Sequence, residues 1–202
     1  MDQAQFPEIL RIEDYDFKFQ PSLNRKQLLD VAELGFIDRC QAVLFIGPSG
    51  TGKTHLGIGL GVRACAAGYH VRFARANELL KRLWAAMADN TLEDALDEVC
   101  RPHLLILDEL SHGTRKPEHD YAAVFYELVS RRYRRGGLVL TTNLGLDQWP
   151  PALGTPSLVT PAVDRLLSSG ASPGRTRPRQ ARRVATRSPT RTVRTRGQLE
   201  TA

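Results

Sequence analysis

The chain has 202 residues, of which 42% are hydrophobic and 25% charged, a composition typical of globular proteins. This length is enough for one domain with a sizeable core and excludes two full enzymatic domains joined by linkers. The net charge of +6 is uneven, because residues 171–202 carry +8 and residues 1–170 carry −2. The globular part is therefore not a basic protein.

The cysteines and the apolar runs limit the location of the chain. The three cysteines are an odd number at spacings that match no metal or redox motif, so we expect free thiols in a reducing compartment. The N-terminus is acidic and polar, unlike a signal peptide, and no apolar stretch approaches the length of a membrane span. We expect a cytoplasmic protein without a membrane partner.

Residues 1–40 are predicted to form an extended lead-in followed by a helix. Aromatic residues alternate with polar ones at Tyr15, Phe17 and Phe19. Ser22 is a plausible helix cap, which predicts a helix from residue 23 to about residue 39.

Residues 41–170 alternate between short apolar runs and amphipathic segments. The apolar runs cover residues 42–46, 71–74, 104–107 and 138–140. The predicted helices cover residues 53–67, 77–89, 92–100 and 119–134. Three of the runs lack polar alternation, as expected for strands buried on both faces. Strict strand–helix alternation predicts an α/β fold with a parallel sheet.

Residues 171–202 differ from the rest of the chain. They hold no aromatic residue, nine Arg and many Thr, Pro and Ser. Such a segment buries too little apolar surface to offset an ordering entropy of about 1–2 kcal/mol per residue, which predicts disorder. Three regions follow: a lead-in with a helix (1–40), a core (41–170) and a basic tail (171–202).

The clearest motif follows the first apolar run and fits the pattern G-x-x-x-x-G-K-[ST]. It comprises Gly47, Pro48, Ser49, Gly50, Thr51, Gly52, Lys53 and Thr54. Glycines let backbone N–H groups converge on phosphate oxygens at a helix N-terminus. Lys53 would reach the β- and γ-phosphates of ATP, and Thr54 would bind Mg²⁺. The alternative is a glycine-rich turn with an exposed lysine.

Polar residues end two further apolar runs. Asp108 and Glu109 follow residues 104–107. Asp108 would hold Mg²⁺, and Glu109, on the opposite side of the strand, would act as general base toward water. Asn143 follows residues 138–142 and would orient that water or sense the γ-phosphate. Alternatively, the acids form a solvated strand end and Asn143 is a cap or turn residue.

Arg165 follows Asp164 on a short predicted helix. An arginine reaching the γ-phosphate of a neighbouring subunit would stabilise the charge of the transition state. A surface ion pair with Asp164 is the alternative.

These elements and their flanks resemble the IstB-like ATP-binding proteins, helper ATPases of insertion-sequence transposition, which are similar to DnaC-type helicase loaders of the AAA+ class. The resemblance covers about residues 6–168. It depends on residues 13–17, 20–23, 47–56, 68–73, 77–80, 105–110, 128–133, 142–144 and 164–166. It implies that Asp108 and Glu109 are the magnesium-binding and water-activating acids, that Asn143 is the first sensor and that Arg165 is the arginine finger.

The chain departs from this family at both ends. Family members begin with a further helical segment before Phe6-Pro7, and they continue after Asp164-Arg165 into another strand and a closing Gly-x-Ser-Tyr-Arg-like segment. We expect N-terminal truncation and a frameshift near residue 170, with a genuine basic tail as the alternative. The sheet would then lack its last strand, and residues 43–46 would form its edge. Whether this chain hydrolyses ATP stays open.

The resemblance also implies DNA binding, ATP-dependent homo-oligomers and contact with a transposase. In the core, four arginines are candidates for phosphate contacts: Arg131, Arg132, Arg134 and Arg135. They equally suit a helix C-terminus, whose dipole favours cations. Other hypotheses are a helicase loader of replication, a degenerate noncatalytic chain that binds nucleotide or DNA, and a small-molecule kinase, to which the strand ends fit less well.

Overall fold

A computed structural model describes residues 4–18, 20–21, 23–111, 120–168 and 182–185 of the chain. Its helices are η2 (Ile12–Asp14), α1 (Arg25–Ala32), α2 (Gly35–Asp38), α3 (Lys53–Ala66), α4 (Ala76–Ala88), α5 (Leu92–Cys100), α6 (Ala122–Arg132), η4 (Leu146–Gln148), α7 (Trp149–Leu153) and α8 (Pro156–Ser168). Its strands are β1 (Ala42–Ile46), β2 (Val71–Arg75), β3 (Leu104–Leu110), β4 (Gly137–Thr142) and β5 (Arg182–Ala185).

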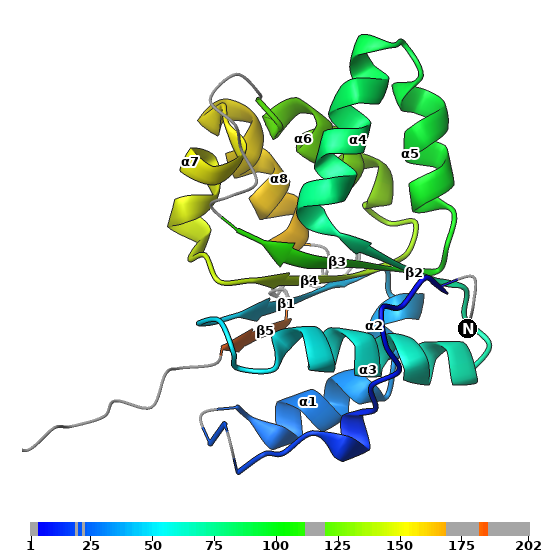
Figure 1. The fold of residues 1–202 in the computed structure, drawn as a ribbon, viewed down its shortest axis with the longest axis vertical. Coiled ribbons are helices and arrows are strands. Elements are labelled where there is room, and N and C mark those ends of the chain that lie inside the picture. Colours follow the sequence, from blue (N-terminus) through cyan, green and yellow to red (C-terminus); the bar gives the residue numbers. More distant parts are fainter. Residues whose placement is uncertain (1–3, 19, 22, 112–119, 169–181, 186–202) are drawn as a thin grey trace, which may run out of the picture.

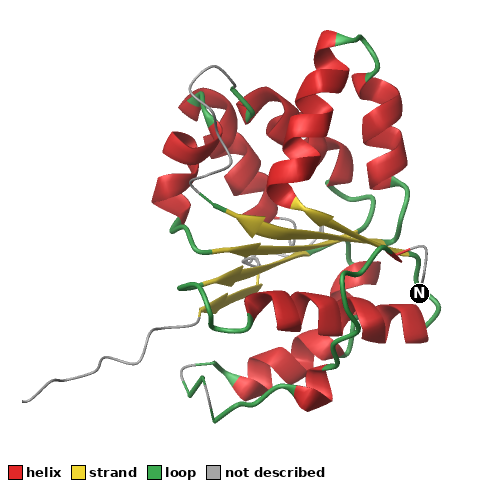
Figure 2. Ribbon diagram, in the orientation of Figure 1, coloured by secondary structure: helices red, strands yellow, loops and turns green. Residues whose placement is uncertain are grey.

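The strands form one parallel sheet in the order β2-β3-β4-β1-β5, which confirms the predicted α/β fold with a parallel sheet. Helices cover both faces of the sheet, so that the molecule has three layers (Figure 2). Helices α1 to α3 lie on one face and α4 to α8 on the other (Figure 1). Parallel strands need this arrangement because their crossovers place helices on the two faces.

Two hydrophobic clusters hold the layers together, one on each face of the sheet. In β1, Ala42 and Leu44 belong to the cluster with α4 to α8, whereas Val43 and Phe45 belong to the cluster with α1 to α3. This alternation is the two-residue period of a strand whose faces are both buried. The absence of polar alternation in the apolar run therefore predicted the position of β1 correctly.

Strand β5 corrects the prediction that the sheet lacks its last strand. β5 pairs with β1 in parallel register, with Val43 opposite Arg182 and Ile46 opposite Ala185. β1 is thus an interior strand, and the disorder predicted for the whole tail is wrong for residues 182–185. A four-residue strand can form wherever an extended backbone segment lies beside the unpaired N–H and C=O groups of an edge strand. The amino-acid composition, averaged over the whole tail, does not detect such a short strand. The rest of the predicted tail lies outside the described residues.

The predicted helices are confirmed in position with one division. The helix expected over residues 23–39 is two helices, α1 and α2, because Leu34 between them has a φ of 61° in the left-handed region. Asn24 caps α1 by accepting a hydrogen bond from the Gln27 N–H at 3.0 Å. The predicted cap Ser22 lies outside the described residues, as do Phe19 and the first residue of the helix predicted from residue 119.

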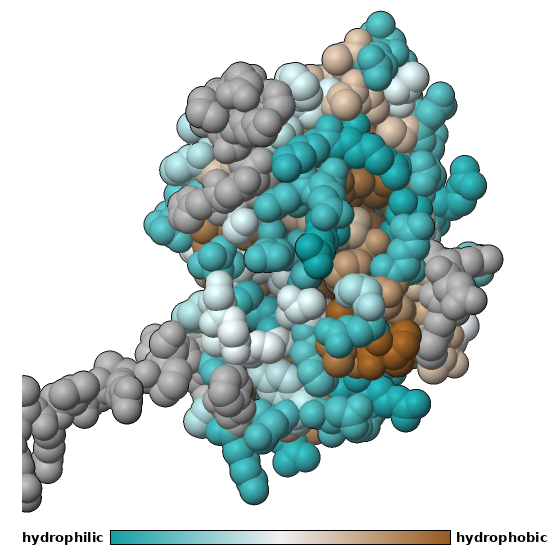
Figure 3. Space-filling model, viewed as in Figure 1, coloured by the Kyte–Doolittle hydropathy of each residue, from teal (hydrophilic) through white to brown (hydrophobic). Residues whose placement is uncertain are grey.

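No helix in the described ranges has both the length and the apolar character needed to cross a bilayer. The face shown in Figure 3 is mostly hydrophilic. A hydrophobic area lies where the N-terminal lead-in crosses the lower half of the molecule (Figures 1 and 3).

Candidate functional site

The phosphate loop, residues 47–54, connects β1 to the first turn of the 14-residue helix α3. Gly50 and Gly52 have φ values of 76° and 78°, which favour glycine. The Thr51 hydroxyl and the Lys53 ammonium both donate to the Pro48 carbonyl, at 2.9 and 2.6 Å. The loop is therefore curled at the N-terminus of α3, where backbone N–H groups lack helical partners.

Asp108 joins the loop to the sheet. Its carboxylate is 5% exposed and lies near the end of β3. It accepts hydrogen bonds from the Thr54 hydroxyl at 2.9 and 3.2 Å and from the Thr141 hydroxyl at 2.7 Å. A buried carboxylate needs such donors, so the two hydroxyls hold it in place beside the loop.

A β-bulge places Glu109 at the same site. Leu107 pairs with Leu140 and Leu110 with Thr142, so that two residues of β3 face Thr141 alone. Glu109 takes a φ of 63°, and its N–H donates to the Thr141 hydroxyl at 2.8 Å. The bulge leaves Asp108 buried and Glu109 exposed, so the two acids have different environments.

The loop and the strand ends enclose a cavity of about 380 Å³, within the size range of small-molecule sites. Its lining residues are Ser49, Gly50, Gly52, Lys53, Thr54, Glu109, Thr141, Thr142 and Asn143. Burial lowers the pKa of the Lys53 ammonium, while Asp108 and Glu109 act in the opposite direction. The structure thus brings together residues from all three predicted motifs: the loop, the acids and Asn143.

Thr141 and Thr142 are the site residues to which the sequence assigned no role. The Thr142 hydroxyl donates to the Leu110 carbonyl at 2.6 Å and accepts from the Leu144 N–H at 3.0 Å, which fixes the turn that carries Asn143. Both threonines are fully buried. Their position at the carboxyl end of an apolar run, beside Asn143, was the signal that could have identified them.

The residues beside the loop also fit Mg²⁺. Thr54 and Asp108 supply a hydroxyl and a carboxylate oxygen 2.9 Å apart, and Mg²⁺ prefers oxygen ligands. Among the described residues no group of three or more His, Cys, Asp or Glu side chains could hold a metal. In nucleotide sites Mg²⁺ is commonly held by one or two protein ligands together with substrate phosphates.

Arg165 does not line this cavity. It lies on α8, where its Nη1 donates to the Ser130 hydroxyl at 2.5 Å and its guanidinium lies 4.5 Å from the centre of the Tyr126 ring. Arg165 therefore lies outside the cavity at the phosphate loop.

The structure separates the four arginines predicted to contact DNA. Arg132 is 2% exposed and donates to the carbonyls of Cys100, Pro102, His103 and Gly137, so its predicted DNA contact is wrong. Burial lowers its pKa to about 10. Arg131 forms ion pairs with Glu93 and Asp97 of α5. Arg134 and Arg135 are exposed.

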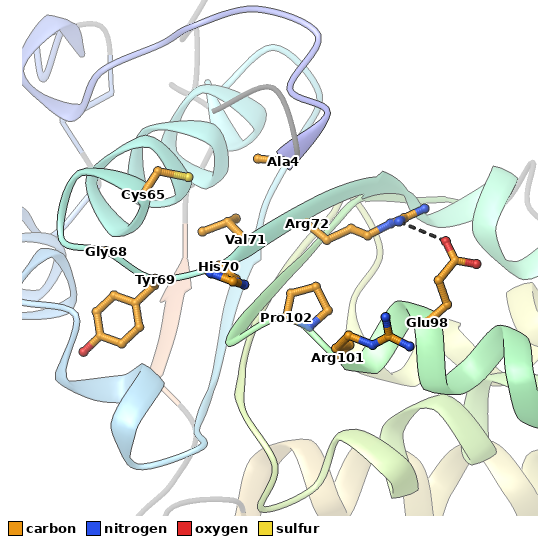
Figure 4. A pocket seen from close by; sticks show the side chains of 10 residues that line it. All are labelled: Ala4, Cys65, Gly68, Tyr69, His70, Val71, Arg72, Glu98, Arg101 and Pro102. Atoms are coloured by element: carbon orange, nitrogen blue, oxygen red, sulfur yellow. Dashed lines mark hydrogen bonds and ion pairs between the residues drawn. The ribbon is translucent and has the colours of Figure 1, made fainter.

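A second cavity, of about 410 Å³, contains none of the predicted site residues. Figure 4 shows Cys65, Tyr69, His70, Arg72, Glu98 and Arg101 around it. It lies at the amino ends of β2 and β3, the sheet edge opposite the phosphate loop. Ligands of open parallel sheets bind at the carboxyl ends of the strands, so the cavity at the phosphate loop is the better candidate.

The fold and this site define a P-loop nucleotide-binding domain. The family described as IstB-like ATP-binding protein matches residues 1–171, and the chain belongs to this family.

Relatives and solved structures agree with this assignment. The ATP-binding protein of insertion sequence IS21 from Pseudomonas aeruginosa is 39% identical over 165 residues, which cover 82% of this chain and 62% of that protein. The corresponding protein of IS232 from Bacillus thuringiensis subsp. berliner is 35% identical over 162 residues, 80% of this chain and 64% of its own. The chain spans a little under two thirds of the length of these relatives.

Two solved structures show the same fold at low sequence identity. The structure of DnaI superposes with a TM-score of 0.62 at 18% sequence identity, and the match covers 88% of this chain and 90% of the DnaI chain. The replication initiator DnaA bound to AMPPCP and single-stranded DNA has a TM-score of 0.64 and 17% identity, over 90% of this chain and 50% of its own.

Proposed function

We propose that this chain is the ATP-binding helper of an insertion sequence: it binds ATP and Mg²⁺ at the phosphate loop, hydrolyses ATP and assists a transposase on DNA. The observation that carries the proposal is the link between Asp108, Thr54 and Thr141 beside the loop. A glycine-rich turn without function has no need of a buried carboxylate held by two hydroxyls.

Nucleotide binding uses the loop and Lys53. The backbone N–H groups of the loop and the α3 dipole attract phosphate oxygens. Lys53 exchanges its hydrogen bond to the Pro48 carbonyl for one to a phosphate, which is stronger because both partners are charged. Thr54 and Asp108 would hold Mg²⁺, which would neutralise phosphate charge when bound together with ATP.

Hydrolysis uses the residues across the cavity from the loop. Asn143 orients a water molecule, and Glu109 accepts a proton from it as the water oxygen attacks the γ-phosphorus. The bond between that phosphorus and the β–γ bridging oxygen breaks, and ADP leaves. Arg165 of a neighbouring subunit stabilises the transferring phosphoryl group, so activity requires an ATP-dependent homo-oligomer.

DNA is bound by exposed arginines within residues 41–170. Arg134 and Arg135 are exposed after α6 and can contact phosphates. The helper would act with the transposase of the same element in the cytoplasm.

A helicase loader of replication is the second candidate. The likeness to DnaI covers 90% of that chain, but at 18% identity it supports the fold alone. The 39% identity to an insertion-sequence protein favours the transposition helper. A degenerate chain without catalysis is the third candidate, and it predicts no hydrolysis that depends on Glu109.

Binding of a fluorescent ATP analogue to Lys53→Ala tests the proposed site. Removing a charged hydrogen-bond donor costs about 1.5–3 kcal/mol, so affinity should fall by roughly 10- to 150-fold. Lys81→Ala, an exposed lysine on α4, is the matched control and should bind like the unsubstituted chain. Equal affinity of the Lys53 and Lys81 variants would contradict the proposed site.

A further inference from the structure

The N-terminal lead-in crosses α3 and reaches the phosphate loop. We call residues 4–17 the lead-in strap; it is the dark blue segment in Figure 1. A Cβ atom on Gly59 would lie 2.9 Å from Ile12 Cγ1, and one on Gly61 would lie 2.7 Å from the Phe6 ring. Both distances are shorter than real Cβ contacts, so the glycines of α3 allow the strap to lie directly on the helix.

Polar contacts also join the strap to α3. The His55 Nε2 atom lies 2.7 Å from the Arg11 carbonyl oxygen, and since a carbonyl only accepts, this nitrogen carries the hydrogen. Arg63 and Glu13 form an ion pair at 3.2 Å. The ion pair is exposed and contributes little, whereas the His55 contact lies one residue beyond the phosphate loop.

Tyr15 at the end of the strap contacts the loop itself. Its hydroxyl donates to the Thr51 carbonyl at 2.9 Å, and the side chain is 7% exposed. A Cβ atom on Gly52 would lie 2.6 Å from Tyr15 Cε2, so the ring lies directly against the loop. The His55 and Phe17 rings pack edge-on against it, with centroids 5.5 and 5.2 Å away.

The hydrogen bond to Thr51 orients the neighbouring peptide N–H. The described chain contains no cis peptide bond, and in a trans peptide the carbonyl and the following N–H point in opposite directions. With the Thr51 carbonyl held by Tyr15, the Gly52 N–H points away from the strap. Gly52 lines the cavity, whereas Tyr15 does not.

We infer that Tyr15 is a positioning residue of the nucleotide site: through Thr51 it aims the Gly52 N–H at the phosphate position. The inference rests on the proposed function of the loop. Burial raises the pKa of the Tyr15 phenol, and Asp16 adds to the rise, so the hydroxyl stays protonated and able to donate. The strap thereby couples the N-terminal end of the domain to phosphate binding.

Tyr15→Phe tests the inference because it removes the hydroxyl and keeps the ring. Loss of one neutral hydrogen bond corresponds to a fall in affinity of about three- to tenfold for a fluorescent ATP analogue. Hydrogen exchange measured without nucleotide should become faster in the loop peptide and stay unchanged in peptides of β2 and α4. Tyr69→Phe is the matched control, because its hydroxyl donates to Asp38 at 2.8 Å and Tyr69 lines the cavity at the other edge of the sheet.

The outcomes separate this inference from the proposed function. Weaker binding with faster exchange confined to the loop supports the positioning role of Tyr15. Affinity equal to that of Tyr69→Phe, or faster exchange throughout the chain together with a lower melting temperature, would overturn it. Failure of the unsubstituted chain to bind the analogue would instead overturn the proposed function.

Discussion

Thr141→Val removes the hydroxyl that holds both acids while keeping nearly the same shape. The Asp108 carboxylate loses one of its two donors, and the Glu109 N–H loses its acceptor. A hydrogen bond to an ionised group contributes about 1.5–3 kcal/mol, and an unpaired, partly buried N–H costs about 1 kcal/mol. We expect the free energy of unfolding to fall by about 2–4 kcal/mol, and the melting temperature by about 5–12 °C.

The comparison variant is Thr155→Val, which removes a threonine hydroxyl that donates to the Asp120 carboxylate and lies outside the cavity. In this variant both acids, and the turn that carries Asn143, keep their hydrogen bonds. ATP hydrolysis should be assayed at a temperature where circular dichroism shows both variants folded. Thr141→Val should hydrolyse at least about tenfold more slowly than Thr155→Val, because catalysis is sensitive to shifts of about 1 Å. Equal rates would refute the role assigned to Thr141.

Further predictions concern charged residues. Because burial lowers the pKa of Lys53, this lysine should lose its positive charge, and nucleotide affinity should weaken, as the pH rises toward the ordinary lysine pKa of 10.5. Constant affinity up to that pH would contradict this prediction. Arg132→Ala leaves buried carbonyl groups unpaired, so it should lower the free energy of unfolding, measured with urea, by about 4 kcal/mol. Arg134→Ala should change this free energy by less than about 0.5 kcal/mol. Arg165→Ala and Glu109→Gln should each lack hydrolysis, and mixing them should restore part of it, since one interface then combines both intact residues; no recovery on mixing would argue against action between subunits.

The spacing of apolar runs and motifs was enough to predict the parallel sheet and the phosphate loop. Strands buried on both faces have no polar alternation, and the loop motif needs a preceding strand and a following helix. Both signals are local, which is why β1, α3 and residues 47–54 were correctly placed.

Features that depend on contacts between distant residues were missed. The role of Arg132 depends on carbonyls of β4 and of the segment before β3, and four arginines in five residues gave no sign that one of them is buried. The bulge at Glu109 depends on the register with β4, which the sequence of β3 alone does not specify. β5 was missed because its pairing uses backbone groups, while the prediction used side-chain composition.

ATP hydrolysis by the unsubstituted chain and by Glu109→Gln is the most direct test of the proposed function. Glu109 lines the cavity, and its side chain forms no hydrogen bond or ion pair with the loop among the described residues, so the variant should bind ATP with unchanged affinity. We predict measurable phosphate release by the unsubstituted chain with Mg²⁺ and a loss of about 100-fold or more in Glu109→Gln, as expected for removal of a general base. Phosphate release at the same rate in both proteins, or none in either, would contradict a catalytic role for this site.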